Sequence, residues 1–133
     1  MKKPKSEVSI SKLQVLQAIS DSLSLELLEA VAKKAATSDD YMQMLDISRK
    51  QYYGRSSRLV NADLIKPIDG RYFLTSFGKL VYQAQLKISA AARCASELRM
   101  IDAIKLHSGL SDNEQKNLID IIIVDSEIKK LIS

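Results

Sequence analysis

One stretch of the chain concentrates the side-chain types that contact phosphates and base edges. Four cationic residues fall within ten positions beside two adjacent tyrosines, and no acidic residue follows until Asp63. Arginine and lysine donate hydrogen bonds to phosphates and to guanine, and glutamine pairs with adenine. The stretch therefore predicts contact with a nucleic acid. Its cationic residues are Arg49, Lys50, Arg55 and Arg58.

The distribution of charge supports the same interpretation. The 133-residue chain has a net charge of +4. The segment 48–71 has six basic and two acidic residues, so its own net charge is also +4. The segment 109–133 has three basic and five acidic residues. A concentrated positive field in mid-chain is typical of a protein that meets phosphates.

Few residues are suited to catalysis or metal binding. The chain has one histidine, His107, and one cysteine, Cys94, and it has neither a phosphate-loop nor a dinucleotide glycine motif. We therefore expect no enzyme, no metal site and no cofactor. His107 is expected at a helix end, where it stabilises the dipole or meets solvent. Cys94 is expected to be a small buried residue, with an intersubunit disulfide as the alternative.

The location of the protein follows from what the sequence lacks. A single cysteine cannot form an intramolecular disulfide, so a reducing cytoplasm is the expected compartment. No apolar run approaches the roughly 18 to 20 residues of a membrane span. The charged N-terminus has no apolar stretch or cleavage site of a signal peptide. We expect a cytoplasmic protein of one domain's length that binds no membrane.

Apolar spacing predicts three helices before the basic stretch. Residues 1–9 form a basic tail, and the first helix follows at 10–19. Asp21 is predicted to cap the second helix, which ends near residue 35 or 36, and Thr37 with Asp40 forms a capping box for the third. The inward side chains are predicted to be Ile10, Leu13, Leu16 and Ile19, then Leu25, Leu28, Val31 and Ala32 with Leu27 beside them, then Tyr41, Met44 and Leu45.

Only Asp46–Ser48 separates the third helix from a basic fourth helix, predicted at 49–61 with Ser48 as its N-cap. Two helices joined by three residues form a helix-turn-helix pattern, and a recognition helix enters the major groove by its N-terminal residues. Tyr52, Ser56, Leu59 and Val60 are predicted to face the core, with the Ser56 hydroxyl bonded to the Tyr52 carbonyl. The outward residues are predicted to be Arg49, Lys50, Gln51, Tyr53, Arg55 and Arg58.

Gly54 lies in the middle of this fourth helix, where glycine costs about 1 kcal/mol relative to alanine. One interpretation is that it removes a side chain where DNA or a neighbouring helix comes close. The other is ordinary close packing.

A hairpin is predicted over 64–74, with its turn at Asp69-Gly70. Pro67 predicts that the first arm is an edge strand or pairs only briefly. Arg71 and Lys66 are placed near the tip, either against DNA or in solvent.

A helix of about 30 residues is predicted from Phe77 to His107, with a coiled-coil-like seam, and it either dimerises or packs within the chain. Ser111 and Glu114 are expected to cap one last helix, whose apolar residues need a partner. The predicted dimerisation residues are Phe77, Val81, Ala84, Ile88, Ala91, Ala95, Leu98 and Ile122.

From about Leu16 to Leu74 the chain resembles the winged helix-turn-helix regulators of the ArsR/MarR type, in particular the archaeal ones. AISDSLSLELLEAV is similar to their first core helix, LDISRKQYYGRSSRLVNADLI to the turn, recognition helix and entry to the wing, and IKPIDGRYFLT to the wing hairpin. The cysteine pairs of metal-sensing members are absent. A helix beyond the wing commonly dimerises in this family. The resemblance implies recognition-helix positions for Arg49, Lys50, Gln51, Tyr53 and Arg55, and a place beside the wing tip for Arg71.

These observations predict a mainly α protein with a small β-hairpin: a basic tail at 1–9, a winged helix-turn-helix domain at 10–76 and a helical dimerisation region at 77–133. Its expected function is sequence-specific binding of double-stranded DNA as a homodimeric transcriptional regulator, with effector unknown. The alternative is a winged-helix module for protein–protein interaction within a transcription or replication complex. The predicted DNA-binding residues are Ser48, Arg49, Lys50, Gln51, Tyr53, Arg55, Arg58, Lys66 and Arg71.

Overall fold

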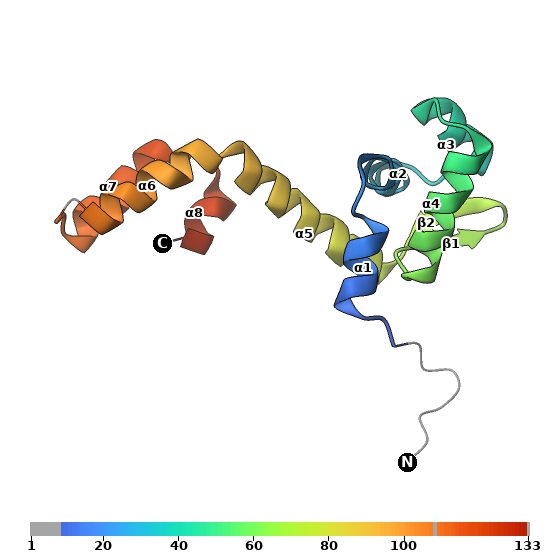
Figure 1. Ribbon diagram of the computed structural model, residues 1–133, viewed down its shortest axis with the longest axis horizontal. Helices are drawn as coiled ribbons and strands as arrows, with labels where there is room; N and C mark the ends of the chain where they lie inside the picture. The colour runs from blue at the N-terminus through green and yellow to red at the C-terminus, as the bar shows by residue number, and fades with distance from the viewer. Residues whose placement is uncertain (1–8, 108, 133) are drawn as a thin grey trace, which may run out of the picture. The chain divides into compact units, whose positions relative to one another are not determined.

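The computed structural model describes residues 9–107 and 109–132, so most of the predicted basic tail lies outside the described residues (Figure 1). The chain is mainly helical with one two-stranded antiparallel hairpin, as predicted. It divides into two compact units, one ending at Tyr82 and one beginning at Gln83. The elements are α1 (Lys12–Ala18), α2 (Ser22–Lys33), α3 (Ser38–Leu45), α4 (Arg49–Asn61), β1 (Ile65–Ile68), β2 (Arg71–Leu74), α5 (Ser76–Arg93), α6 (Ala95–His107), α7 (Asp112–Ile122) and α8 (Ser126–Ile132).

The core of the first unit lies between α2, α4 and the hairpin. Helix α2 contacts α3, α4 and β2, and α4 also contacts α1 and runs beside β1 (Figure 1). Burial of large apolar side chains here supplies the main stabilisation, at roughly 25 cal/mol per Å² of apolar surface. The largest fully buried side chains of this core are Tyr41, Tyr52, Leu27, Leu28, Leu59, Leu64 and Ile65.

The predicted helix caps before α3 and α4 are confirmed. Thr37 and Asp40 form a reciprocal capping box at α3. Helix α3 ends at Asp46, whose left-handed φ of 51° lets the chain turn sharply. Ser48 caps α4 after a three-residue connector, so the start of α4 is set by local hydrogen bonds.

The hairpin is also confirmed, with Ile65 opposite Leu74 and Ile68 opposite Arg71. Its turn residues Asp69 and Gly70 both have positive φ, of 52° and 78°, which a two-residue type I′ turn requires. The β2 strand is further attached to the segment after α2, because the Tyr72 N–H donates to the Ala36 carbonyl at 2.9 Å.

The junction between the hairpin and α5 is tightly packed. The Thr75 N–H donates to the Leu64 carbonyl at 3.1 Å, and the Gly78 N–H donates to Thr75 Oγ1 at 2.8 Å. A Cβ on Gly78 would lie 2.0 Å from the Leu64 carbonyl oxygen. Only glycine therefore permits this approach of α5 to the residue that precedes β1.

Several predicted core positions in the first unit are wrong. Leu13 and Leu16 are exposed, and α1 instead packs through Val15 and Ala18. Met44 is exposed as well, and Met42 packs against the core in its place. In α1 the turn that carries Val15 and Ala18 packs against α4, which leaves Leu13 and Leu16 on the outer side. Leu25 and Ala32 are half-buried, Leu28 and Val31 are buried as predicted, and Ile10, Ile19 and Leu45 are partly buried against the core.

The second unit has a separate small core made by the end of α5, α6, α7 and α8. Its buried residues are Ala90, Ile101, Ile119, Ile123 and Ile128.

Two helices predicted as continuous in this region are interrupted. The long helix is broken at Cys94, which is half-buried, and the last helix is broken between Ile122 and Ser126. The second break has a clear cause, because Asp125 Oδ1 accepts hydrogen bonds from the Glu127 and Ile128 N–H groups and so starts α8. Ser111 is the N-cap of α7, as predicted, and its side chain accepts the Glu114 N–H. The predicted capping box is incomplete, because the Glu114 carboxylate accepts from the Ser111 hydroxyl and not from the Ser111 N–H.

Candidate nucleic-acid interface

The rotation of α4 about its axis is fixed by one buried face. Tyr52, Ser56 and Leu59 are buried and Val60 is half-buried, as the sequence predicts. The Ser56 hydroxyl bonds the Tyr53 carbonyl at 3.4 Å, and not the predicted Tyr52 carbonyl. Because this face packs against the core, the opposite face of α4 points to solvent.

The N-terminal half of α4 presents four exposed side chains, Arg49, Lys50, Gln51 and Tyr53. The Arg49 guanidinium carbon lies 5.9 Å from the centroid of the Tyr53 ring, within the range of a cation–π contact. The Tyr53 ring also meets the buried Tyr52 ring edge-on, with centroids 5.0 Å apart. Tyr53 therefore lies between a buried ring and a cation while 41% of it remains exposed.

Gln51 has a structural role that was missed in the sequence. Its Oε1 accepts the Ser48 N–H at 3.0 Å, while its own N–H donates to Ser48 Oγ at 3.2 Å. The Ser-x-x-Gln spacing of a capping box indicated this role. Bidentate pairing with adenine, predicted for Gln51, needs the same side-chain oxygen, so the two roles compete.

Arg55 does not project freely outward as predicted. Its Nε donates to Asp21 Oδ2 at 2.7 Å and its Nη1 donates to the Gln51 carbonyl at 3.1 Å, and only 24% of its side chain is exposed. Arg58 is more open, with Nη2 3.9 Å from Asp21 Oδ1 and Nε 3.3 Å from the Gly54 carbonyl. The basic residues of α4 thus form an accessible pair near its start and a restrained pair, one in its middle and one in its last turn.

Asp21 is the partner of Arg55, and the sequence predicts for it only the role of a helix cap. It occupies the N-cap position of α2, but its side chain makes no capping bond and accepts from Ser24 Oγ and Arg55 instead. Partial burial acts to raise the pKa of Asp21, but the hydrogen bonds from Ser24 and Arg55 outweigh it and hold the pKa below its ordinary value.

Gly54 lies exposed at the centre of the outer face of α4. In the described part of the chain, no heavy atom outside the glycine's local backbone lies within 4 Å of the position that a Cβ would occupy. Close packing inside the chain, one of the two interpretations of this glycine, is therefore wrong.

The hairpin adds two exposed cations, Lys66 on β1 and Arg71 beside the turn. All of the net charge of +4 belongs to residues 1–82, whereas residues 83–133 contain seven basic and seven acidic residues. The positive charge is thus carried by the unit that contains α4 and the hairpin.

The predicted dimerisation residues do not share one exposed face. Ala91, Leu98 and Ile122 pack against the core of the second unit, Val81 packs against that of the first, and Ala95 is half-buried. Those that remain exposed are Phe77, Ala84 and Ile88, together with Leu80, which the prediction did not include and which is 71% exposed.

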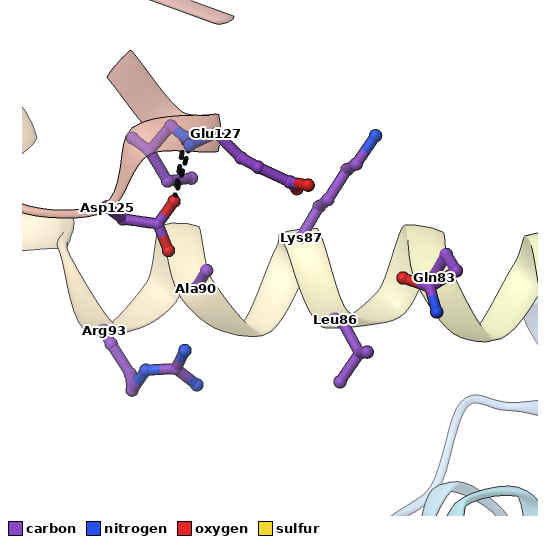
Figure 2. A pocket seen from close by; sticks show the side chains of 8 residues that line it. Gln83, Leu86, Lys87, Ala90, Arg93, Asp125 and Glu127 are labelled. Atoms are coloured by element: carbon purple, nitrogen blue, oxygen red, sulfur yellow. Dashed lines mark hydrogen bonds between the residues drawn. The ribbon is translucent and has the colours of Figure 1, made fainter. Parts of the chain in front are cut away.

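A cavity of about 290 Å³ in the second unit lies between α5 and α8. Figure 2 shows that Ala90 points toward α8 while Leu86 and Arg93 point away from it, and that Asp125 is already bonded to the α8 backbone. Its polar groups do not converge on one point, as a small-molecule site requires. The lining residues are Gln83, Leu86, Lys87, Ala90, Arg93, Asp125, Glu127 and Ile128.

Within residues 9–107 and 109–132 no group of three or more His, Cys, Asp or Glu side chains is placed to hold a metal ion. No helix in the same ranges combines the length and apolar character needed to cross a membrane. Helix α6 ends at His107, as predicted. The predicted helix end also includes Ser108, which lies outside the described residues.

Comparison of the chain with protein-family models, with curated proteins and with solved structures gives no match.

Proposed function

We propose that this chain is a homodimeric transcriptional regulator of the ArsR/MarR type that binds double-stranded DNA in the cytoplasm. In this proposal residues 10–76 form a winged helix-turn-helix domain, α4 enters the major groove, and the β1–β2 hairpin contacts the backbone or the minor groove. The observation that carries the proposal is the exposure of Arg49, Lys50 and Tyr53 on the outer face of a helix whose rotation is fixed by its buried face.

The surroundings of α4 agree with this role. The three-residue connector from α3 and the Ser48–Gln51 capping box hold the N-terminus of α4 in one geometry. A recognition helix needs such rigidity because base contacts depend on positions held to within about half an ångström. The bond from Tyr72 to Ala36 anchors the hairpin beside the same core, so that Lys66 and Arg71 belong to one framework with α4.

Dimerisation is proposed through the exposed apolar stripe of α5, formed by Phe77, Leu80, Ala84 and Ile88. Their spacing of three, four and four residues places them on one side of the helix. A large apolar side chain at 71% exposure, as for Leu80, gains from burial against a second copy. Two copies of α4 would then read half-sites about 34–36 Å apart.

A second candidate is a winged-helix module that binds another protein. It is favoured by the apolar residues exposed in the second unit, which has no net charge: Met100, Leu106, Ile121, Val124 and Leu131. The two candidates differ in what they require of α4, since a protein-interaction module has no use for its exposed cations.

Binding to random-sequence duplex DNA at low salt separates the two candidates. We expect Arg49→Ala/Lys50→Ala to weaken binding at least tenfold, because both exposed cations contact phosphates or bases. The matched control is Arg99→Ala/Lys116→Ala, which removes the same charge from exposed positions in the second unit. Equal binding by wild type and both variants, or no binding by wild type, would favour the protein-interaction module.

A further inference from the structure

Gly54 is the residue of α4 with the lowest helix-forming preference, and the described residues show no contact that explains it. Glycine in a helix interior shifts the folding equilibrium about fivefold against the native state relative to alanine. Such a residue usually relieves a close contact or permits a left-handed backbone. At Gly54 neither applies, because the space for a Cβ is open and the residue lies within regular helix.

Gly78 shows what an internal requirement looks like in the same protein. Its missing Cβ makes room for the Leu64 carbonyl, which would otherwise lie 2.0 Å away. At Gly54, apart from its chain neighbours and the local helix backbone, no heavy atom of the described residues lies within 4 Å of the corresponding position. The described residues therefore supply no contact that requires glycine at position 54, which leaves a binding partner as a source of such a requirement.

The neighbours of Gly54 indicate what that partner is. Lys50 lies one turn before it and is exposed, and Tyr53 lies beside it with its ring held by Arg49 and Tyr52. A bare patch of backbone bordered by a cation and a phenol matches the chemistry of a base-pair edge, which offers acceptors to the lysine and apolar surface to the glycine.

We propose that Gly54 is the point of closest approach between α4 and the floor of the major groove, and that it contributes to sequence specificity. The inference rests on the proposed DNA binding. An α-helix with its side chains is about 10–12 Å across, and the major groove is about 12 Å wide and 8.5 Å deep. At that fit, removing one side chain at the centre of the helix lets the backbone descend until it meets the base edges.

The experiment begins by selecting duplexes from a random-sequence pool with the wild-type protein. We then compare wild type, Gly54→Ala and Gly54→Leu for affinity to a selected duplex and for low-salt affinity to random duplex. Gly54→Ala is expected to raise the thermal midpoint by about 4 °C. It is also expected to weaken binding to the selected duplex at least tenfold, with a larger loss for leucine and less than a threefold change on random duplex.

The matched control is Asn61→Ala, at the exposed last position of α4, which improves helix propensity without filling the space at Gly54. It should raise stability and leave both affinities within about twofold. Wild-type affinity for the selected duplex in Gly54→Ala would overturn the inference. An equal loss on selected and random duplexes would also overturn it, since the phosphate backbone would then be what approaches. If wild type selects and binds no duplex, the proposed function itself fails.

Discussion

Arg55 donates a hydrogen bond from Nε to Asp21 Oδ2 across 2.7 Å and thereby joins the start of α2 to the middle of α4. Both side chains are partly buried, so solvent screens the pair less than a surface ion pair. The same carboxylate lies 3.9 Å from Arg58. One acidic residue thus restrains two of the four cations that α4 carries.

We expect Asp21→Asn to lower the free energy of unfolding by about 1 kcal/mol, because a charge-assisted hydrogen bond between partly exposed groups is lost. Urea denaturation at pH 7 measures this change. Asp63→Asn is the control, since Asp63 is exposed and its left-handed φ of 61° suits asparagine equally well. A loss of the same size in the control would show that the effect does not come from the Asp21–Arg55 pair.

The stability difference between wild type and Asp21→Asn should depend on pH. The folded-state pKa of Asp21 is lowered, so its contribution is fully present above its unfolded pKa and is lost as pH falls through the folded value. The difference measured at pH 7 should therefore persist to about pH 4 and shrink below it. Urea titrations at pH 7, 5 and 3 test this, and a difference that stays constant to pH 3 would contradict the assignment.

Two buried tyrosines should respond oppositely to loss of their hydroxyl groups. The Tyr41 hydroxyl donates to the Lys34 carbonyl at 2.7 Å, so Tyr41→Phe should destabilise the protein by about 1 kcal/mol. Within the part of the chain that the structure describes, the buried Tyr52 hydroxyl has no hydrogen-bond partner, although the nearby Ser38 side chain acts to lower its pKa. Tyr52→Phe should therefore be neutral or stabilising, and chemical denaturation of the two variants compares them directly.

Burial raises the pKa of Tyr52 to about 12, which should make Tyr52 titrate late among the five tyrosines. Because the folded pKa exceeds the unfolded one, its stabilising effect is present below about pH 10 and is lost as pH rises toward 12. Absorbance of tyrosinate between pH 9 and 12.5 should show a late step that Tyr52→Phe removes. Loss of the absorbance change near pH 10, with the change near pH 12 kept, in Tyr52→Phe would disprove this.

Introducing a glutamate into the exposed stripe of α5 should dissociate the proposed dimer. Ile88→Glu places a charge where a second copy would bury an apolar side chain, and we expect a shift from dimer to monomer in light scattering coupled to size exclusion. Met44→Glu, on the exposed side of α3, is the matched control and should leave the mass unchanged. A wild-type monomer at micromolar concentration would contradict the dimerisation proposal.

Gly78→Ala should destabilise the protein by about 3 kcal/mol, since the added Cβ would meet the Leu64 carbonyl and force the backbone apart. Gly54→Ala should have the opposite sign, which makes the two glycines a matched pair for thermal denaturation. Equal effects would show that the space around each glycine does not determine its role.

Elements defined by neighbouring residues could be predicted from the sequence. The caps at Thr37 and Ser48 and the Asp69-Gly70 turn each depend on contacts within about four residues, and all three are confirmed. The pair between Asp21 and Arg55 joins positions 34 residues apart, and no local pattern indicates it. The exposure of Leu13 has the same origin, because the side of α1 that meets α4 is decided by tertiary packing.

Two features that the sequence indicates were missed, one at the candidate interface and one in the second unit. The Ser48–Gln51 spacing indicates a capping box, which assigns the Gln51 oxygen to the helix start. The break before α8 was also indicated, because Asp125 followed by Ser126 offers an N-cap inside an apolar run. We expected Gln51 to contact a base and the C-terminal apolar run to form one helix. In both cases the structure shows a local hydrogen bond that favours the other arrangement.

The contact of Gly78 with the Leu64 carbonyl has a mechanical consequence. The first turn of α5 and the residues just before β1 share this contact and the hydrogen bonds of Thr75, whose hydroxyl accepts from the Gly78 N–H and donates to the Asp63 carbonyl. A displacement of the first turn of α5 relative to the hairpin would break these contacts. We therefore expect the two to move together as one rigid piece.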